Sequence, residues 1–167
     1  MEPKIIDRAQ ITLVGFSFFG DPFKLSGGWT EENEIGRLWQ RFMTYFVAQR
    51  DRLKHVTSAT VCYELHIEHA ETRRTGEYEV FVGVEVSQLE DVPVELTIKI
   101  LPAATYAVFT LIGQEITSDW PIAIEAWLSR SNYRRAGAYG FQYYDERFKD
   151  MQHIEESALD VYVPVWQ

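Results

Sequence analysis

Alternating apolar and polar positions, interrupted by turn-forming residues, predict a chain made mostly of β-strands. The alternating runs are rich in β-branched and aromatic residues, which favour extended backbone. They cover residues 11–16, 60–67, 78–86, 94–100, 106–113, 139–144 and 159–165. Runs 60–67 and 78–86 are separated by a polar turn containing Thr75 and Gly76, so we expect them to pair as a hairpin.

Two further segments repeat their apolar residues at helical spacing. The first carries Ile35, Leu38, Trp39, Phe42, Tyr45 and Phe46 at steps of three and four. Thr30 precedes it as a candidate N-cap, followed by acidic residues that suit the first turn of a helix. The second segment opens at Ser118–Pro121, and its apolar stripe consists of Trp120, Ile124, Trp127 and Leu128.

The two halves of the chain present these elements in the same order. Each half has a strand, a loop, a helix with a central tryptophan (Trp39 or Trp127), and two more strands. We therefore predict one domain over residues 1–167, built from pseudo-repeats of about 1–90 and 91–167. No linker or low-complexity stretch divides the sequence.

Composition narrows the classes of protein that this chain can represent. The 167 residues are 46% hydrophobic, enough for a proper core, and the formal net charge of −9 disfavours direct contact with nucleic acid. No apolar run is long enough to span a membrane, and the N-terminus lacks the features of a signal peptide, so we expect a cytoplasmic protein. The single cysteine, Cys62, forms neither an internal disulfide nor a thiolate metal cluster.

The loop between residues 18 and 29 combines turn-forming residues with several aromatic residues. It carries Phe18, Phe19, Phe23 and Trp29 among glycines and a proline. Two interpretations remain open at this stage: the rings plug one end of the core, or they form a lid over a ligand site.

Several segments together are similar to a known family. They are Gly36–Phe42, Tyr78–Val86, Leu101–Ala103 leading into Tyr106–Phe109, Ala126–Leu128, Phe141–Asp145 and Val161–Val165. In this order and at these separations they resemble the GyrI-like or AraC-type effector-binding domain, which also forms the drug-sensing module of MerR-type multidrug regulators. The resemblance covers nearly the whole chain.

The resemblance implies an α+β fold made of a duplicated β-α-β-β unit. In such a domain an antiparallel sheet is backed by two helices, and a ligand cleft lies between the halves. Relatives hold lipophilic, often cationic molecules there among aromatic rings, with a buried carboxylate as counter-charge. We accordingly expect a small-molecule-binding domain that needs no metal and no organic cofactor. No helix-turn-helix region is expected, because the strand pattern begins within the first dozen residues.

One position departs from the family pattern. After Phe141, where the family commonly has glutamate, this chain has Gln142, which offers a donor and an acceptor but no charge. Either the ligand preference shifts toward neutral compounds, or another acid supplies the charge. Glu64 and Glu85 are the candidates, and alternation predicts that Glu64 faces the cleft if Tyr63 faces the helices.

The predicted ligand-binding residues are mainly aromatic side chains of the strands and helices. They are Trp39, Tyr63, Glu64, Phe81, Tyr106, Phe109, Trp127, Gln142 and Tyr144. For the rings, core packing is the competing interpretation. We predict no metal site: the histidines of His66-x-x-His69 face opposite ways in an extended strand.

Two other functions stay open as alternatives. Some relatives resemble hydrolases that open strained electrophilic rings with a cleft acid and a tyrosine, although Gln142 is unable to relay a proton. Others resemble protein-binding inhibitors of DNA gyrase, for which an acidic surface would imitate DNA. The sequence contains no catalytic motif, so we assign no catalytic residue.

Overall fold

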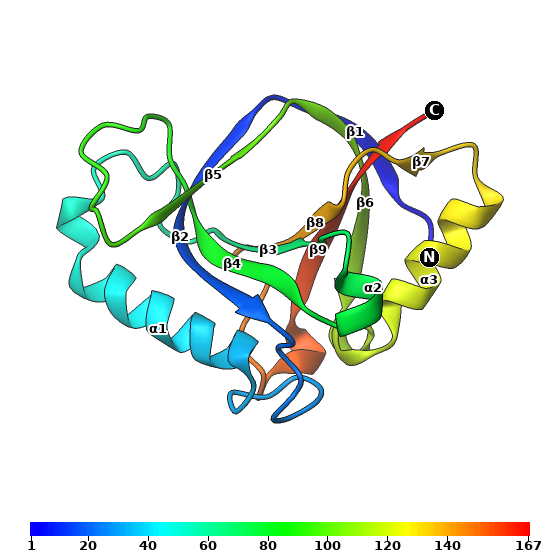
Figure 1. The fold of residues 1–167 in the computed structure, drawn as a ribbon, viewed down its shortest axis with the longest axis horizontal. Helices are drawn as coiled ribbons and strands as arrows, with labels where there is room; N and C mark the ends of the chain where they lie inside the picture. The colour runs from blue at the N-terminus through cyan, green and yellow to red at the C-terminus, as the bar shows by residue number, and fades with distance from the viewer.

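A computed structural model describes all residues from 1 to 167, and it contains one antiparallel sheet of nine strands with two longer helices (Figure 1). The strands are β1 (Lys4–Arg8), β2 (Ile11–Gly20), β3 (Cys62–Ile67), β4 (Tyr78–Glu85), β5 (Thr97–Leu101), β6 (Ala104–Ile112), β7 (Arg134–Arg135), β8 (Tyr139–Tyr144) and β9 (Ala158–Trp166). The helices are α1 (Glu34–Ala48), the short α2 (Thr72–Thr75) and α3 (Trp120–Arg130). This confirms the predicted α+β class.

The two halves of the sheet have equivalent strand orders when each is followed outward from the centre. The full order is β1-β6-β9-β8-β3-β4-β2-β5, with β7 paired to β9. From the central contact between β3 and β8, one side runs β3-β4-β2-β5 and the other runs β8-β9-β6-β1. The β1 and β5 strands precede β2 and β6 in the chain, yet β1 pairs with β6 and β5 pairs with β2. Each half therefore lends an edge strand to the other.

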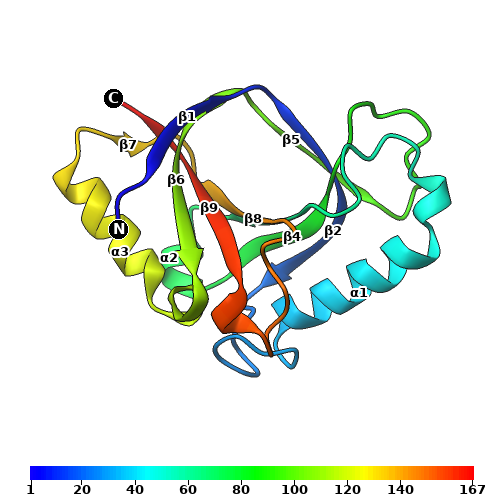
Figure 2. The same cartoon turned by 180° about the vertical axis from the view of Figure 1, so that it is seen from behind.

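The sheet is strongly curved, and its two faces bury different cores. Figure 1 shows β1 and β5 arching over the top while α1 and α3 lie on the two flanks below. On the helix side, α1 packs on β2 and β4 through Leu38, Phe42 and Phe46, and α3 packs on β6 and β9 through Ile124 and Trp127. The other face encloses a core made only of strand residues, which we call the strand core. Figure 2 shows β6 and β9 from behind, beside α3.

The helix α1 begins at Glu34, and its N-cap lies three residues after the predicted Thr30. Its N-cap is Asn33, whose Oδ1 accepts a hydrogen bond from the Gly36 amide at 2.9 Å, while its Nδ2 donates to the Gly28 carbonyl at 2.7 Å. Asn33 is 2% exposed, so its amide ties the preceding loop to the helix. Thr30 instead stabilises a local turn by accepting from the Glu32 amide.

Most predicted strands lie within a few residues of the observed ones, and the predicted hairpin is formed by β3 and β4. The prediction of strand 94–100 was partly wrong. Residues 94–96 form a turn in which the Leu96 amide donates to the Pro93 carbonyl, and the strand begins at Thr97. The sequence pattern also missed β1, which is short and rich in charged residues.

The aromatic loop after β2 is divided between the two interpretations. Phe18 packs against the α1 core, whereas Phe19, Phe23 and Trp29 are largely exposed. None of these rings lines the cavity that is bordered by Glu64, Trp120 and Gln142. In this structure the loop is neither a complete plug nor a closed lid.

Neither α1 nor α3 combines the length and the apolar character that crossing a bilayer would require.

Candidate functional site

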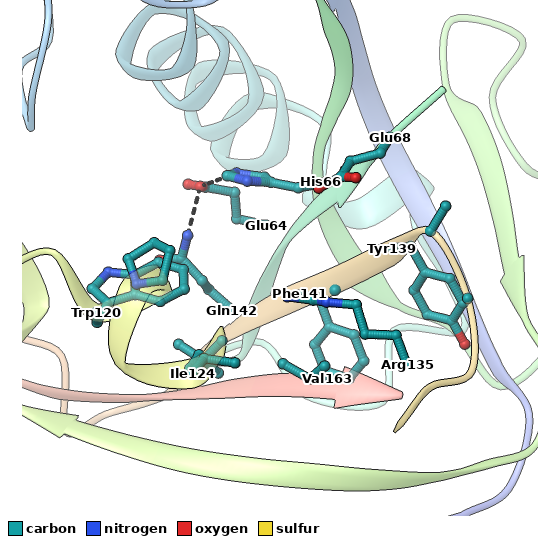
Figure 3. Close-up of a pocket in the computed structure, with 15 residues that line it drawn as sticks. Glu64, His66, Glu68, Trp120, Ile124, Arg135, Tyr139, Phe141, Gln142 and Val163 are labelled. Carbon is teal, nitrogen blue, oxygen red and sulfur yellow. Dashed lines mark hydrogen bonds and ion pairs between the residues drawn. The ribbon is translucent and has the colours of Figure 1, made fainter. Parts of the chain in front are cut away.

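A cavity of about 180 Å³ opens on the helix side of the sheet, between the two halves of the chain. Its floor is formed by side chains of β3, β8 and β9, and one wall is the first turn of α3 with Trp120 and Ile124 (Figure 3). Val161 and Val163 of β9 supply the apolar floor, and Tyr139 of β8 also lines the cavity. The site therefore combines apolar walls with a small set of polar groups, as ligand pockets usually do.

The most buried polar group at this cavity is the carboxylate of Glu64, which is 3% exposed. Three side chains make hydrogen bonds to it. The Trp39 indole Nε1 donates to Oε2 at 2.5 Å, and the Gln142 amide donates to Oε1 at 3.0 Å. His66 Nε2 also lies 2.7 Å from Oε1 (Figure 3). A buried carboxylate needs such partners, because the loss of hydration is otherwise uncompensated.

Strand register brings these groups together. Glu64 and Gln142 are direct cross-strand partners in the β3–β8 pair, at the centre of the sheet. His66 lies two residues further along β3 and so points to the same face as Glu64. The α1 helix crosses this face and brings Trp39 to the carboxylate from above.

A hydroxyl group behind the cavity fixes the orientation of Gln142. Tyr144 donates to Gln142 Oε1 at 2.8 Å, which leaves the Gln142 Nε2 directed at Glu64. The Tyr144 ring also packs edge-on against Trp39, with ring centroids 4.9 Å apart. Burial, and then the nearby Glu64 charge, raises the pKa of Tyr144 well above its ordinary value, so this hydroxyl remains a donor.

The charge of Glu64 has little compensation from the protein. Among the ion pairs in the structure Glu64 takes part in one only, with His66, which is charged only when protonated. The guanidinium at the cavity, that of Arg135, is engaged by Glu125. Glu68 adds a second acid to the lining. The interior of the cavity therefore favours positive charge.

Removing the Tyr144 hydroxyl should loosen this arrangement. In Tyr144→Phe the Gln142 carbonyl loses its partner in a buried place, and we expect the free energy of unfolding to fall by about 1–2 kcal/mol. Urea denaturation followed by circular dichroism measures this loss. A Tyr133→Phe variant is a control, because no hydrogen bond involves the Tyr133 hydroxyl, and it should change stability by less than about 0.5 kcal/mol. Equal stability of Tyr144→Phe and wild type would contradict the role assigned to this hydroxyl.

The nine predicted ligand residues fall into three places. Glu64 and Gln142 line the cavity, and Trp39 and Tyr144 are bonded directly to them. Phe109 and Trp127 pack in the core between α3 and the sheet. Tyr63, Phe81 and Tyr106 are at most 1% exposed in the strand core, on the face away from the cavity.

The two faces of β3 differ from the prediction in one respect. Tyr63 and Glu64 point to opposite faces, as alternation predicts, but the cavity shares its face with both helices. Tyr63 therefore faces the strand core rather than the helices. The other candidate acid, Glu85, lies away from the cavity, where it accepts from the Tyr63 hydroxyl at 2.6 Å and pairs with Arg8.

Sequence reasoning missed His66, Trp120 and Tyr139 as lining residues. The two-residue spacing between Glu64 and His66 was the available signal, since it places both on one face of a strand. His66-x-x-His69 does not converge: His66 bonds Glu64, whereas the His69 ring packs on Phe19. No group of three or more His, Cys, Asp or Glu side chains is arranged to hold a metal ion.

Comparison with known proteins identifies the family. Residues 4–165 match the model of a family described as integron-associated effector binding protein. The chain belongs to this family. It is a GyrI-like effector-binding domain, as the sequence motifs predicted.

One curated relative is the transcriptional regulator BrlR of Pseudomonas aeruginosa. It is 25% identical over 168 residues, which cover 99% of this chain and 56% of the regulator. The present chain thus spans about half the length of that relative.

Solved structures show the same fold. SAV2435 bound to tetraphenylphosphonium has a TM-score of 0.71 at 18% identity, covering 99% of this chain and 94% of that one. An integron cassette protein from the mobile metagenome of Vibrio cholerae has a TM-score of 0.63 at 16% identity, covering 99% and 96%.

Proposed function

We propose that this effector-binding domain takes up a lipophilic organic cation in the cavity between α3 and the centre of the sheet, with Glu64 as the counter-charge. The observation that carries the proposal is a carboxylate, 3% exposed, that borders a largely apolar cavity without a lysine or arginine partner. A cation placed beside it interacts through a low local dielectric and gains more than it would in water.

The walls of the cavity suit an aromatic or alkyl cation. Trp120 offers an indole at the entrance of α3, and Ile124, Val161 and Val163 provide apolar surface. Indole rings attract cations through their negative face. Burying apolar ligand area against these groups contributes about 25 cal/mol for each Å² removed from water.

The volume of the cavity limits how much of a ligand enters. A space of about 180 Å³ is below the several hundred Å³ of typical drug sites and close to the cavity size that holds a single benzene ring. A bulky cation would therefore insert one aryl group and leave the rest at the mouth, or displace Trp120, which is only partly buried. The positive centre would then lie near Glu64.

This proposal accounts for the glutamine at the position where the family commonly has glutamate. Gln142 donates to Glu64 at 3.0 Å and supports the carboxylate without adding a like charge beside it. The counter-charge is thus moved across the strand pair, from β8 to β3. The complex of the fold relative SAV2435 with tetraphenylphosphonium supports a ligand of this class.

A ligand series of matched shape tests the proposal. Tryptophan fluorescence is titrated with tetraphenylphosphonium, the neutral triphenylphosphine oxide and the anion tetraphenylborate, and each mixture is then analysed by mass spectrometry. We expect saturable quenching that is strongest for the cation, because Trp120 lines the cavity and Trp39 bonds Glu64. The compounds should be recovered intact. Equal affinity for all three charges, or no saturable binding, would count against a cation site.

A further inference from the structure

His66 is the histidine that lines the cavity, and it contacts the buried Glu64 carboxylate. Its Nε2 lies 2.7 Å from Glu64 Oε1, and its side chain is 30% exposed, whereas Glu64 is buried. Imidazole gains or loses a proton between about pH 5 and 8. When neutral, His66 donates one hydrogen bond to the carboxylate; when protonated, it becomes the positive partner of Glu64.

We infer that His66 is a specificity-determining residue that competes with the ligand for the charge of Glu64, so that a cation binds with release of a proton. The inference rests on the proposed function, since it concerns the same cavity. Protonated His66 and a ligand cation would lie close together beside one carboxylate. Their repulsion makes the cation prefer the neutral form of His66, and by linkage a rise in pH strengthens cation binding.

Some of the other titratable groups around His66 keep one charge state over the pH range of interest. The remaining ones are acids. The Tyr78 ring of β4 lies 5.3 Å from the His66 ring. Burial, and then the charges of Glu64, Asp21 and Glu68, raises the pKa of Tyr78, which keeps this phenol neutral. Arg135 of β7 is paired with Glu125, and arginine is charged at every accessible pH. Two acids remain, Glu64 itself and Glu68.

The facing elements contribute no further ionisable side chain to this contact. Gln142 of β8 and Trp39 of α1 bond the same carboxylate, and both are neutral at every pH of interest. Trp120 of α3 borders the cavity as an uncharged ring. A proton that tracks cation binding therefore belongs to His66 or to one of the two acids.

Calorimetry with tetraphenylphosphonium between pH 5.5 and 8.5 tests the inference, because the charge of this ligand is permanent. In the wild type we expect the association constant to rise by up to about tenfold per pH unit at the steepest point and then level off. Titration in buffers of different ionisation enthalpy should show up to one proton released per ligand. Triphenylphosphine oxide, which is neutral, should bind with little dependence on pH.

The decisive variant is His66→Gln, in which the amide donates to Glu64 as neutral histidine does but never becomes charged. We expect the Kd of this variant for tetraphenylphosphonium to change by less than about threefold between pH 5.5 and pH 8.5. At pH 5.5 the variant should bind about tenfold more tightly than the wild type. Structural damage does not produce tighter binding at one pH only.

A matched control is His69→Gln, because His69 is exposed and its ring packs on Phe19 outside the cavity. This variant should keep the wild-type pH profile. If His66→Gln also keeps that profile, the proton belongs to an acid, and the inference is wrong while cation binding stands. Glu64-dependent binding without any pH dependence would overturn it too. If tetraphenylphosphonium fails to bind at every pH, the proposed function itself fails.

Discussion

Replacing Glu64 with glutamine is expected to raise the Kd for tetraphenylphosphonium about 100-fold, which corresponds to about 2.7 kcal/mol. The variant keeps the shape of the side chain and removes its charge. A glutamine at this position still accepts from the Trp39 indole through its carbonyl, and its NH2 group donates to neutral His66. The Gln142 amide turns over so that its oxygen accepts from the same NH2 group, and the local packing is retained. The effect is large because the wild-type carboxylate is 3% exposed, where water screens it poorly.

The same variant should bind triphenylphosphine oxide within about threefold of the wild type, because no charge is involved. Glu68→Gln is the matched control: Glu68 also lines the cavity but is exposed, so its charge is screened and the cation affinity should change less than about threefold. Fluorescence titration at pH 8 measures all of these values. A Glu64→Gln protein that binds the cation as tightly as the wild type would contradict the counter-charge.

Truncating Trp127 to alanine is expected to lower the free energy of unfolding by about 3–5 kcal/mol. Trp127 is 8% exposed and packs between α3 and the sheet, with its ring edge-on to Phe109 and stacked on Tyr133. Loss of the indole leaves a void in a core where close packing is the rule. Chemical denaturation followed by far-UV circular dichroism gives the difference in stability.

Ile122→Ala provides the control on the same helix. Ile122 is 69% exposed, and its truncation should cost less than about 0.5 kcal/mol. A Trp127→Ala protein of nearly wild-type stability, but with a strongly weakened ligand affinity, would show that Trp127 acts in the site rather than in the core.

The alternation of residues along the chain predicted those strands whose own side chains are patterned for a sheet. The run Tyr139–Tyr144 was predicted with its observed bounds, because aromatic residues occupy every second position, Tyr139, Phe141 and Tyr143, on one face of the strand. Lys4–Arg8 has no such pattern: its residues are mostly exposed, and it becomes a strand because β6 offers a free edge. Tertiary pairing of this kind leaves little trace in the sequence.

Only part of the candidate site could be predicted from the sequence. Alternation separates Glu64 from Tyr63, but it does not say which face of the sheet the helices cover. In this fold the helices and the cavity share one face, while the other face closes on itself into the strand core. Aromatic residues such as Phe81 and Tyr106 fill that second core, so their number in the strands does not mark a ligand site.

The charged group lies beside an uncharged partner at the centre of the sheet. Glu64 and Gln142 are paired at the centre of the sheet, where the two halves of the strand order meet. A carboxylate at both positions would place like charges about one hydrogen bond apart, and one of the two would hold a proton. One acid and one amide provide a single negative charge instead, fixed by Tyr144 behind and Trp39 above.

The most direct test of the cation site is a crystal structure of the domain with tetraphenylarsonium, located by the anomalous scattering of arsenic. We expect one strong arsenic peak at the cavity bordered by Glu64, Trp120 and Val163, within about 4–6 Å of the Glu64 carboxylate. An arsenic peak elsewhere on the molecule, with the cavity free of ligand, would contradict it.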